Sequence, residues 1–124
     1  MEQFAGKTFL IVDDEELLRE YFVEEFTDLG AKTLSAANSK DALELVRTEK
    51  VDVILSDIRM PGGDGVSLLK HVKEQNAEKP LVFLITGFSD IEPEEAVSLG
   101  AETVFKKPFD FNLIASKIAD HLDE

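Results

Sequence analysis

The chain has 124 residues, 44% of them hydrophobic and 31% charged, which are the size and composition of one globular domain. It contains no cysteine, which excludes disulfides and thiolate metal sites. Acidic residues outnumber basic residues 26 to 13, and the formal charge of −13 argues against direct binding to nucleic acid and favours a divalent cation or a partner with a basic face.

Five short runs of apolar and β-branched residues predict five strands. In chain order they lie at residues 8–12, 32–36, 51–56, 81–86 and 102–106. The third and fourth runs are almost purely apolar, as expected of strands that are covered on both faces.

Each predicted strand is followed by a stretch in which apolar residues recur at helical spacing. In chain order the predicted helices include residues 17–26, 42–46, 66–72, 93–99 and 110–122. Gly30 and Gly100 are the C-terminal signals of the first and fourth helices, and Asn38 or Ser39 is the N-cap of the second. The third helix is expected to begin near Asp64.

Five repeats of strand then helix, within one domain over residues 1–124, predict an α/β fold. Five units are too few for an eightfold barrel, so the pattern favours an open, doubly wound parallel sheet with helices on both faces. Ligands of such sheets bind beyond the carboxyl ends of the strands, and candidate functional residues are therefore sought there.

Polar and charged side chains stand at four of the five predicted strand ends. They are Asp13 and Asp14 after the first strand, Asp57 after the third, Thr86 at the end of the fourth, and Lys106 and Lys107 at the end of the fifth. Carboxylates are the hard oxygen ligands that Mg²⁺ prefers, while an ammonium and a hydroxyl facing the ion suit a phosphoryl group. One carboxylate is a candidate nucleophile, because aspartyl-phosphate is a known covalent intermediate.

The segments LIVDDEE, DVILSDIRMPGGDG, LITG and FKKPF carry these residues. In their order and spacing the chain resembles, over its whole length, the receiver domain of two-component response regulators. The resemblance implies a flavodoxin-like (βα)5 fold whose five parallel strands lie in the order 2-1-3-4-5. It also implies a phosphorylation-dependent signalling switch, and not an enzyme, although self-phosphorylation and autodephosphorylation are expected.

The resemblance assigns a role to each residue of the site. Asp57 would accept a phosphoryl group from a sensor histidine kinase or a His-phosphotransfer protein, and the domain would then alter a partner-binding surface whose output partner the sequence does not name. The implied Mg²⁺ ligands are Asp13, Asp14, Asp57 and the backbone carbonyl of Arg59. Thr86 and Lys107 would bind the phosphoryl group, and the bond between Lys107 and Pro108 would be cis.

Two positions depart from the family pattern. Val104 stands three residues before Lys107, where the family commonly has an aromatic residue that swings inward on activation. Gly63, between Gly62 and Asp64, stands where the family often has a large residue. Apart from these departures, Phe88 follows Thr86 by two residues and is an apolar neighbour of the site. We therefore expect the output signal to leave the site by a route that does not use an aromatic residue on the last strand.

Each site residue also has a structural interpretation. Asp13 or Asp14 caps the first helix in one alternative, and Asp57 forms a turn in another. Thr86 is a good strand residue in its own right. Lys106 and Lys107 point to opposite faces by strand alternation, so one of them is a solvated strand end.

Other functions are compatible with parts of the pattern. A Mg²⁺-dependent phosphohydrolase with an aspartyl nucleophile usually has a second Asp two residues later, where this chain has Arg59. A flavodoxin-like electron carrier needs a Ser/Thr-rich loop after the first strand, where this chain has four acids. A docking module that works without phosphorylation is the third alternative, and the complete set of Asp, Thr and Lys residues argues against it.

The chain opens with no basic and apolar leader, and no apolar run reaches the length that spans a membrane. We therefore expect a cytoplasmic protein with no membrane partner. The expected cofactor is the Mg²⁺ ion of the carboxylate site.

Overall fold

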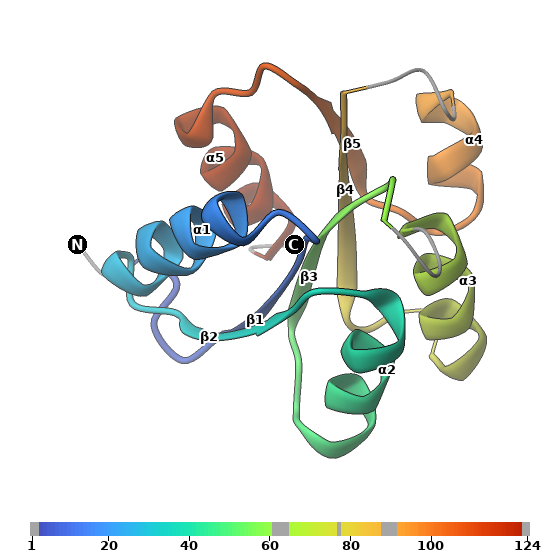
Figure 1. The fold of residues 1–124 in the computed structure, drawn as a ribbon, viewed down its shortest axis with the longest axis horizontal. Helices are drawn as coiled ribbons and strands as arrows, with labels where there is room; N and C mark the ends of the chain where they lie inside the picture. The colour runs from blue at the N-terminus through green and yellow to red at the C-terminus, as the bar shows by residue number, and fades with distance from the viewer. Residues whose placement is uncertain (1–2, 61–64, 77, 88–91, 123–124) are drawn as a thin grey trace.

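The computed structural model describes residues 3–60, 65–76, 78–87 and 92–122, and over these residues strands and helices alternate. The elements are β1 (Thr8–Val12), α1 (Glu16–Asp28), β2 (Lys32–Ala36), α2 (Ser39–Thr48), β3 (Val53–Asp57), α3 (Gly65–Gln75), β4 (Leu81–Thr86), α4 (Pro93–Ser98), β5 (Thr103–Lys106) and α5 (Phe111–Leu122). All strand pairs are parallel, and the sheet order is β2-β1-β3-β4-β5 (Figure 1). The predicted fold class and strand order are confirmed.

The sheet separates two hydrophobic cores, because successive side chains of a strand point to opposite faces. Along β1, Phe9 and Ile11 pack toward α1 and α5, whereas Leu10 and Val12 pack toward α2, α3 and α4. Figure 1 shows the two groups of helices on opposite sides of the sheet. This arrangement covers the central strands on both faces, as their apolar sequence predicts.

The boundaries of two strands differ from the prediction. β3 runs from Val53 to Asp57 and β5 begins at Thr103, whereas the sequence placed these strands at residues 51–56 and 102–106. Asp57 is a strand residue because it pairs with Ile85 of β4, so it ends β3 instead of following it. Residues 61–64 and 88–91, which include the predicted helix start at Asp64 and the side chain of Phe88, lie outside the described residues.

The predicted helix ends are confirmed by local geometry. Asn38 is the N-cap of α2, and its Oδ1 accepts a hydrogen bond from the backbone N–H of Asp41 at 2.8 Å. Gly30 and Gly100 follow α1 and α4 with φ angles of 96° and 113°. Glycine reaches this left-handed region without steric strain, which explains why these helices end there.

The segment before β1 carries a core residue that the sequence patterns did not indicate. Phe4 is 1% exposed, and its ring centroid lies 4.8 Å from that of Phe9 and 5.8 Å from that of Phe26. Its backbone N–H donates to the carbonyl of Leu29 at 2.8 Å. The segment therefore covers the core between β1 and α1 at the end where β1 begins and α1 ends.

Among the described residues, no helix combines the length and apolar character needed to cross a membrane.

Candidate functional site

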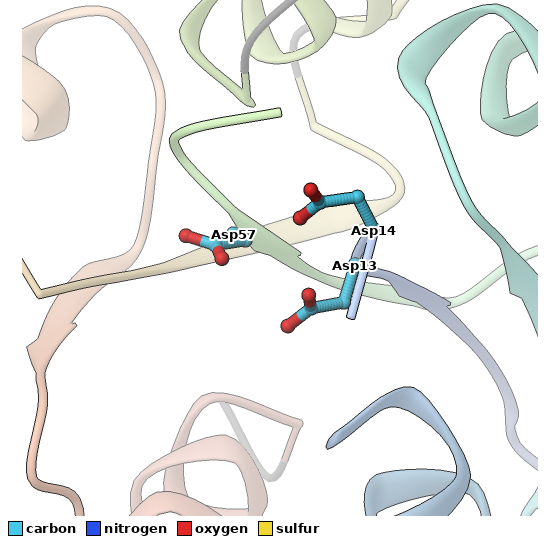
Figure 2. Close-up of side chains that lie close together, drawn as sticks. All are labelled: Asp13, Asp14 and Asp57. Carbon is cyan, nitrogen blue, oxygen red and sulfur yellow. The ribbon is translucent and has the colours of Figure 1, made fainter. Parts of the chain in front are cut away.

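The carboxyl ends of β1 and β3 lie side by side and bring three carboxylates together. β1 pairs with β3 up to Val12 and Ser56, so Asp13 and Asp14 follow one strand where Asp57 ends the next. One carboxylate oxygen from each of these residues lies within 4.8 Å of the others (Figure 2). Hard oxygen donors at this separation fit a divalent cation such as Mg²⁺, which brings several waters to complete its coordination.

Asp13 is fixed by hydrogen bonds on three sides. Its backbone N–H donates to the carbonyl of Ala36 at 3.1 Å, its own carbonyl accepts from Nη1 of Arg19 at 2.8 Å, and its Oδ1 accepts from the backbone N–H of Glu15 at 2.8 Å. Glu15, not Asp13 or Asp14, is the N-cap residue of α1, and it makes no side-chain capping bond. The bond between Asp13 and Glu15 belongs to the turn before the helix, and it engages one of the two oxygens of Asp13.

Burial and like charges act together on the carboxyl group of Asp13. The residue is 1% exposed, and its pKa is raised from 3.8 to about 6. Burial is the largest cause, and the charges of Asp57 and Asp14 add to it, whereas the Glu15 hydrogen bond and Lys107 oppose it. A cation placed among these carboxylates would relieve the same repulsion.

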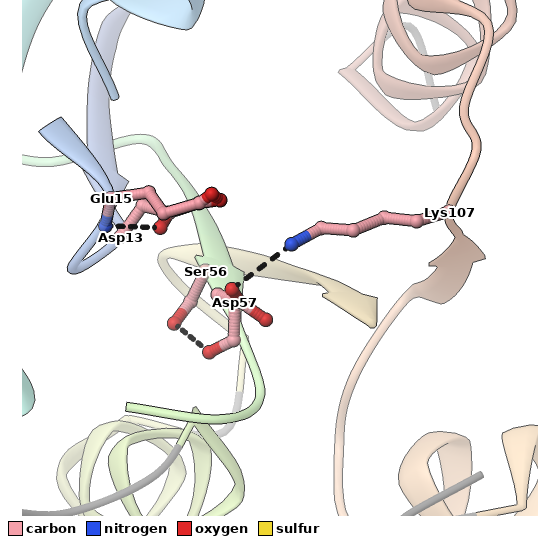
Figure 3. Close-up of polar contacts among 5 residues, drawn as sticks. All are labelled: Asp13, Glu15, Ser56, Asp57 and Lys107. Atoms are coloured by element: carbon pink, nitrogen blue, oxygen red, sulfur yellow. Dashed lines mark hydrogen bonds and ion pairs between the residues drawn. The ribbon is translucent and has the colours of Figure 1, made fainter. Parts of the chain in front are cut away.

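Lys107 reaches the site from the end of β5. Its Nζ lies 3.2 Å from Oδ2 of Asp57, and the Asp57 side chain is 9% exposed (Figure 3). The backbone N–H of Lys107 donates to the carbonyl of Thr86 at 2.8 Å, which extends the β4–β5 pairing to the base of the lysine side chain. The neighbouring Lys106 is exposed, so the structure distinguishes the two lysines.

The remaining predicted features of the site lie at or just beyond the ends of β3, β4 and β5. Thr86 ends β4, the strand beside β3, and is 3% exposed. Arg59 lies two residues beyond Asp57 and has an exposed side chain. The Lys107–Pro108 peptide bond is cis. The predicted residues Asp13, Asp14, Asp57, Thr86 and Lys107 thus all stand at the carboxyl edge of the sheet.

Two residues near the site were missed by the sequence interpretation. Gly65 opens α3 so close to β3 that a Cβ there would lie 2.4 Å from the backbone oxygen of Asp57. Arg19 holds the Asp13 carbonyl from the second turn of α1. The spacing of residue types alone does not show which backbone atoms approach each other, and the sequence therefore identified neither residue.

The model of the response regulator receiver domain family matches residues 9–119. The sporulation initiation phosphotransferase F of Bacillus subtilis is 37% identical over 118 residues, which are 94% of each chain. The regulator of RpoS from Escherichia coli is 35% identical over 86% of this chain, but this chain spans only 32% of that protein.

Solved structures show the same fold. The receiver domain of the Francisella response regulator 1452 has a TM-score of 0.85 and 28% identity, over 96% of this chain and 100% of that one. The response regulator TrrA of Thermotoga maritima, solved in complex with Mg²⁺ and beryllium fluoride, has a TM-score of 0.83 and 26% identity, over 92% of this chain and 97% of that one.

Proposed function

This chain belongs to the response regulator receiver domain family, whose members are signalling domains and not catalytic enzymes, and from that membership we propose that it is a switch operated by phosphorylation of Asp57. The observation that carries the proposal is the contact of Lys107 with Asp57 at 3.2 Å, beside three carboxylate oxygens that lie within 4.8 Å of one another. A cation and an ammonium on either side of one carboxylate are the arrangement that a negatively charged phosphoryl group requires.

The proposed reaction transfers a phosphoryl group from a phosphohistidine to Asp57. An oxygen of the Asp57 carboxylate forms the new P–O bond while the P–N bond to the histidine ring breaks, and the imidazole leaves with the bonding electrons and takes up a proton. Bound Mg²⁺ supplies charge neutralisation for the phosphoryl oxygens. The donor is a sensor histidine kinase or a His-phosphotransfer protein, and the proposed location of this chain is the cytoplasm.

The proposal gives each residue of the site a role in metal binding or in phosphoryl binding. Asp13, Asp14, Asp57 and the carbonyl of Arg59 would hold the Mg²⁺ ion. Lys107 turns from the free carboxylate to an oxygen of the attached phosphoryl group, and the hydroxyl of Thr86 donates to another. The transfer adds charge at one edge of the sheet and changes the hydrogen bonds there, which biases the surface presented to an output partner. Water later hydrolyses the acyl phosphate and resets the domain.

The acceptor is tested by mass. The parent, Asp57→Asn and Asp120→Asn, an exposed carboxylate on α5, are incubated with acetyl phosphate and Mg²⁺, and the intact mass of each is recorded. The parent and Asp120→Asn gain the mass of one phosphoryl group, and Asp57→Asn gains none. A full gain by Asp57→Asn would refute the assignment. Sustained hydrolysis of a small phosphomonoester by the parent would instead favour a phosphohydrolase.

A further inference from the structure

Arg19 makes a contact that the phosphorylation scheme does not use. It belongs to the second turn of α1, and its Nη1 donates to the backbone carbonyl of Asp13 at 2.8 Å. Its side chain is half-buried and lines a hollow between α1 and β2 together with Val23 and Ser35. The guanidinium therefore reaches back from the helix to the loop that carries the carboxylates.

The contact completes a set of restraints on Asp13. The N–H of the residue is held by Ala36 of β2, and one carboxylate oxygen is held by the N–H of Glu15 (Figure 3). The carbonyl is the third group, and Arg19 supplies its donor. With both backbone groups engaged, the peptide units on either side of Asp13 resist rotation, and the carboxylate keeps its direction toward Asp14 and Asp57.

We propose that Arg19 is a positioning residue for the cation site, which fixes the Asp13 loop in its binding conformation before Mg²⁺ arrives. This inference rests on the proposed function. Three carboxylates that repel one another tend to separate when no cation is present, and Asp13 and Asp57 are the buried members of the group. A donor on the backbone of Asp13 opposes that movement without occupying a carboxylate oxygen that the ion needs.

The type of side chain matters to this role. A guanidinium is always charged, donates a hydrogen bond in a fixed plane, and tolerates partial burial better than an ammonium does. A charge-assisted bond to a carbonyl is stronger than a neutral one, so it restrains the loop against the local repulsion. A role confined to packing would need only the aliphatic part of Arg19.

Three variants separate these roles. Arg19→Met keeps the aliphatic part and removes the donor, and Arg19→Lys keeps a charged donor. Arg47→Met is the matched control, because Arg47 lies on the exposed face of α2, where it pairs with Glu44 at 3.6 Å. Supporting contacts of this kind change metal affinity by about 10-fold or more when they are removed.

The first measurement needs no metal. In the metal-free protein, hydrogen exchange by NMR reports whether the N–H of Glu15 stays bonded to Asp13. We expect exchange at Glu15 to become about 10-fold faster in Arg19→Met and to stay close to the parent value in Arg19→Lys and Arg47→Met. Unchanged exchange in Arg19→Met would overturn the inference, whether or not the parent accepts a phosphoryl group.

The second measurement uses Mg²⁺ alone and then Mg²⁺ with acetyl phosphate. Calorimetric titration of Arg19→Met should show Mg²⁺ affinity about 10-fold weaker, with most of the affinity restored in Arg19→Lys. The phosphorylation rate should need more Mg²⁺ for half its maximum but reach a maximum within about twofold of the parent. Parent-like Mg²⁺ affinity in Arg19→Met would overturn the inference, whereas a parent that takes no phosphoryl group would refute the proposed function instead.

Discussion

Asp13 is a carboxylate that folding buries before a cation is available to compensate its charge. Its pKa is 3.8 in the unfolded reference and about 6 in the folded protein, chiefly because of burial. Below pH 3.8 it is protonated in both states and does not change the balance between them. Between these two pKa values the unfolded chain releases the proton and the folded chain retains it, so the free energy of unfolding falls as the pH rises.

The substitution Asp13→Asn should therefore stabilise the metal-free protein. Asn retains an oxygen that accepts from Glu15 and removes the buried charge, so we expect a free energy of unfolding ~1–3 kcal/mol higher than in the parent above about pH 6. The difference should close near pH 4. Urea unfolding of both proteins across this pH range, in the presence of a chelator, measures the difference in the free energy of unfolding. Saturating Mg²⁺ should narrow this difference by stabilising the parent more than the variant. A variant less stable than the parent at pH 8 would contradict the explanation.

Gly65 is a residue whose missing side chain matters to the site. A Cβ at this position would lie 2.4 Å from the backbone oxygen of Asp57 and 3.1 Å from Cα of Ile58. The N–H of Gly65 also donates to the carbonyl of Ile58 at 2.8 Å, so α3 cannot move away without losing this bond. Gly65→Ala should lower the free energy of unfolding by about 1–3 kcal/mol and slow phosphorylation by displacing Asp57.

Gly87 supplies the control for that prediction. A Cβ there would meet Cδ of Lys107 at 3.6 Å, which is ordinary van der Waals contact with a flexible side chain. Urea midpoints and phosphorylation rates of Gly65→Ala and Gly87→Ala are compared with the parent. Equal stability of the two variants would show that α3 adjusts without strain.

The residues at the strand ends, which make up most of the candidate site, could be predicted from the sequence. The residues that hold them in place could not. Asp13, Asp57 and Lys107 end or follow parallel strands, and topology alone brings such residues to one edge. Arg19 and Gly65 act on backbone atoms of other segments, and those contacts depend on how α1 and α3 sit on the sheet. A pattern of residue types carries no information about that placement.

At the scale of elements, apolar periodicity predicted all ten helices and strands in the described part of the chain, and the errors lie at their ends. The run of apolar and β-branched residues placed Val51 and Asp52 in the third strand, and both are buried, yet β3 begins at Val53. Asp52 still bonds to both neighbouring strands. Its N–H donates to the carbonyl of Thr8 at 2.9 Å, its carbonyl accepts from the N–H of Leu81 at 3.0 Å, and its carboxylate accepts from the N–H of Thr8 at 2.8 Å. The exact residue at which a strand begins depends on backbone geometry, which the residue types do not specify.

The segment before β1 provides an element-scale test, since Phe4 belongs to no helix or strand and yet is 1% exposed. Phe4→Ala removes a ring that contacts Phe9 and Phe26, and core truncations of this size cost about 3–5 kcal/mol. Leu17→Ala is the control, because Leu17 is 82% exposed and its loss should change stability by less than about 0.5 kcal/mol. Similar urea midpoints for Phe4→Ala and the parent would show that the segment does not contribute to the core.

At the scale of the whole molecule, the two cores differ in character, and the difference bears on how a signal could cross the fold. Phe83 and Phe105 stack at a centroid distance of 6.2 Å in the core beneath α1 and α5. Val104 faces the other core, with Leu84 and Ala96 of α4. Thr86 follows Leu84 by two residues, so strand alternation turns its side chain to that same face. The aromatic residue of β5 is thus on the opposite face of the sheet from Thr86.

A signal that begins at Thr86 should therefore reach α4 without a ring movement on β5. Val104 is stiff at χ1 and offers no long side chain to fill space near Thr86. The test compares backbone and methyl NMR shifts with and without beryllium fluoride and Mg²⁺, which together imitate the phosphoryl group on Asp57. Away from the carboxylates, the largest changes should occur at Gly87 and in Pro93–Ser98. The same shifts at residues 88–91, which the structure does not describe, would extend this route through Phe88.

The variant Val104→Ala makes the prediction decisive. If β5 has no moving part, the changes in α4 persist in this variant with amplitudes close to those of the parent, even though the variant loses some packing against Leu84. Val104 methyl shifts should stay nearly constant when the analogue binds to the parent. Loss of the α4 response in Val104→Ala, together with remote changes centred on Val104 in the parent, would place the switch on β5 after all, because the residue would then both move with the signal and be needed to pass it on.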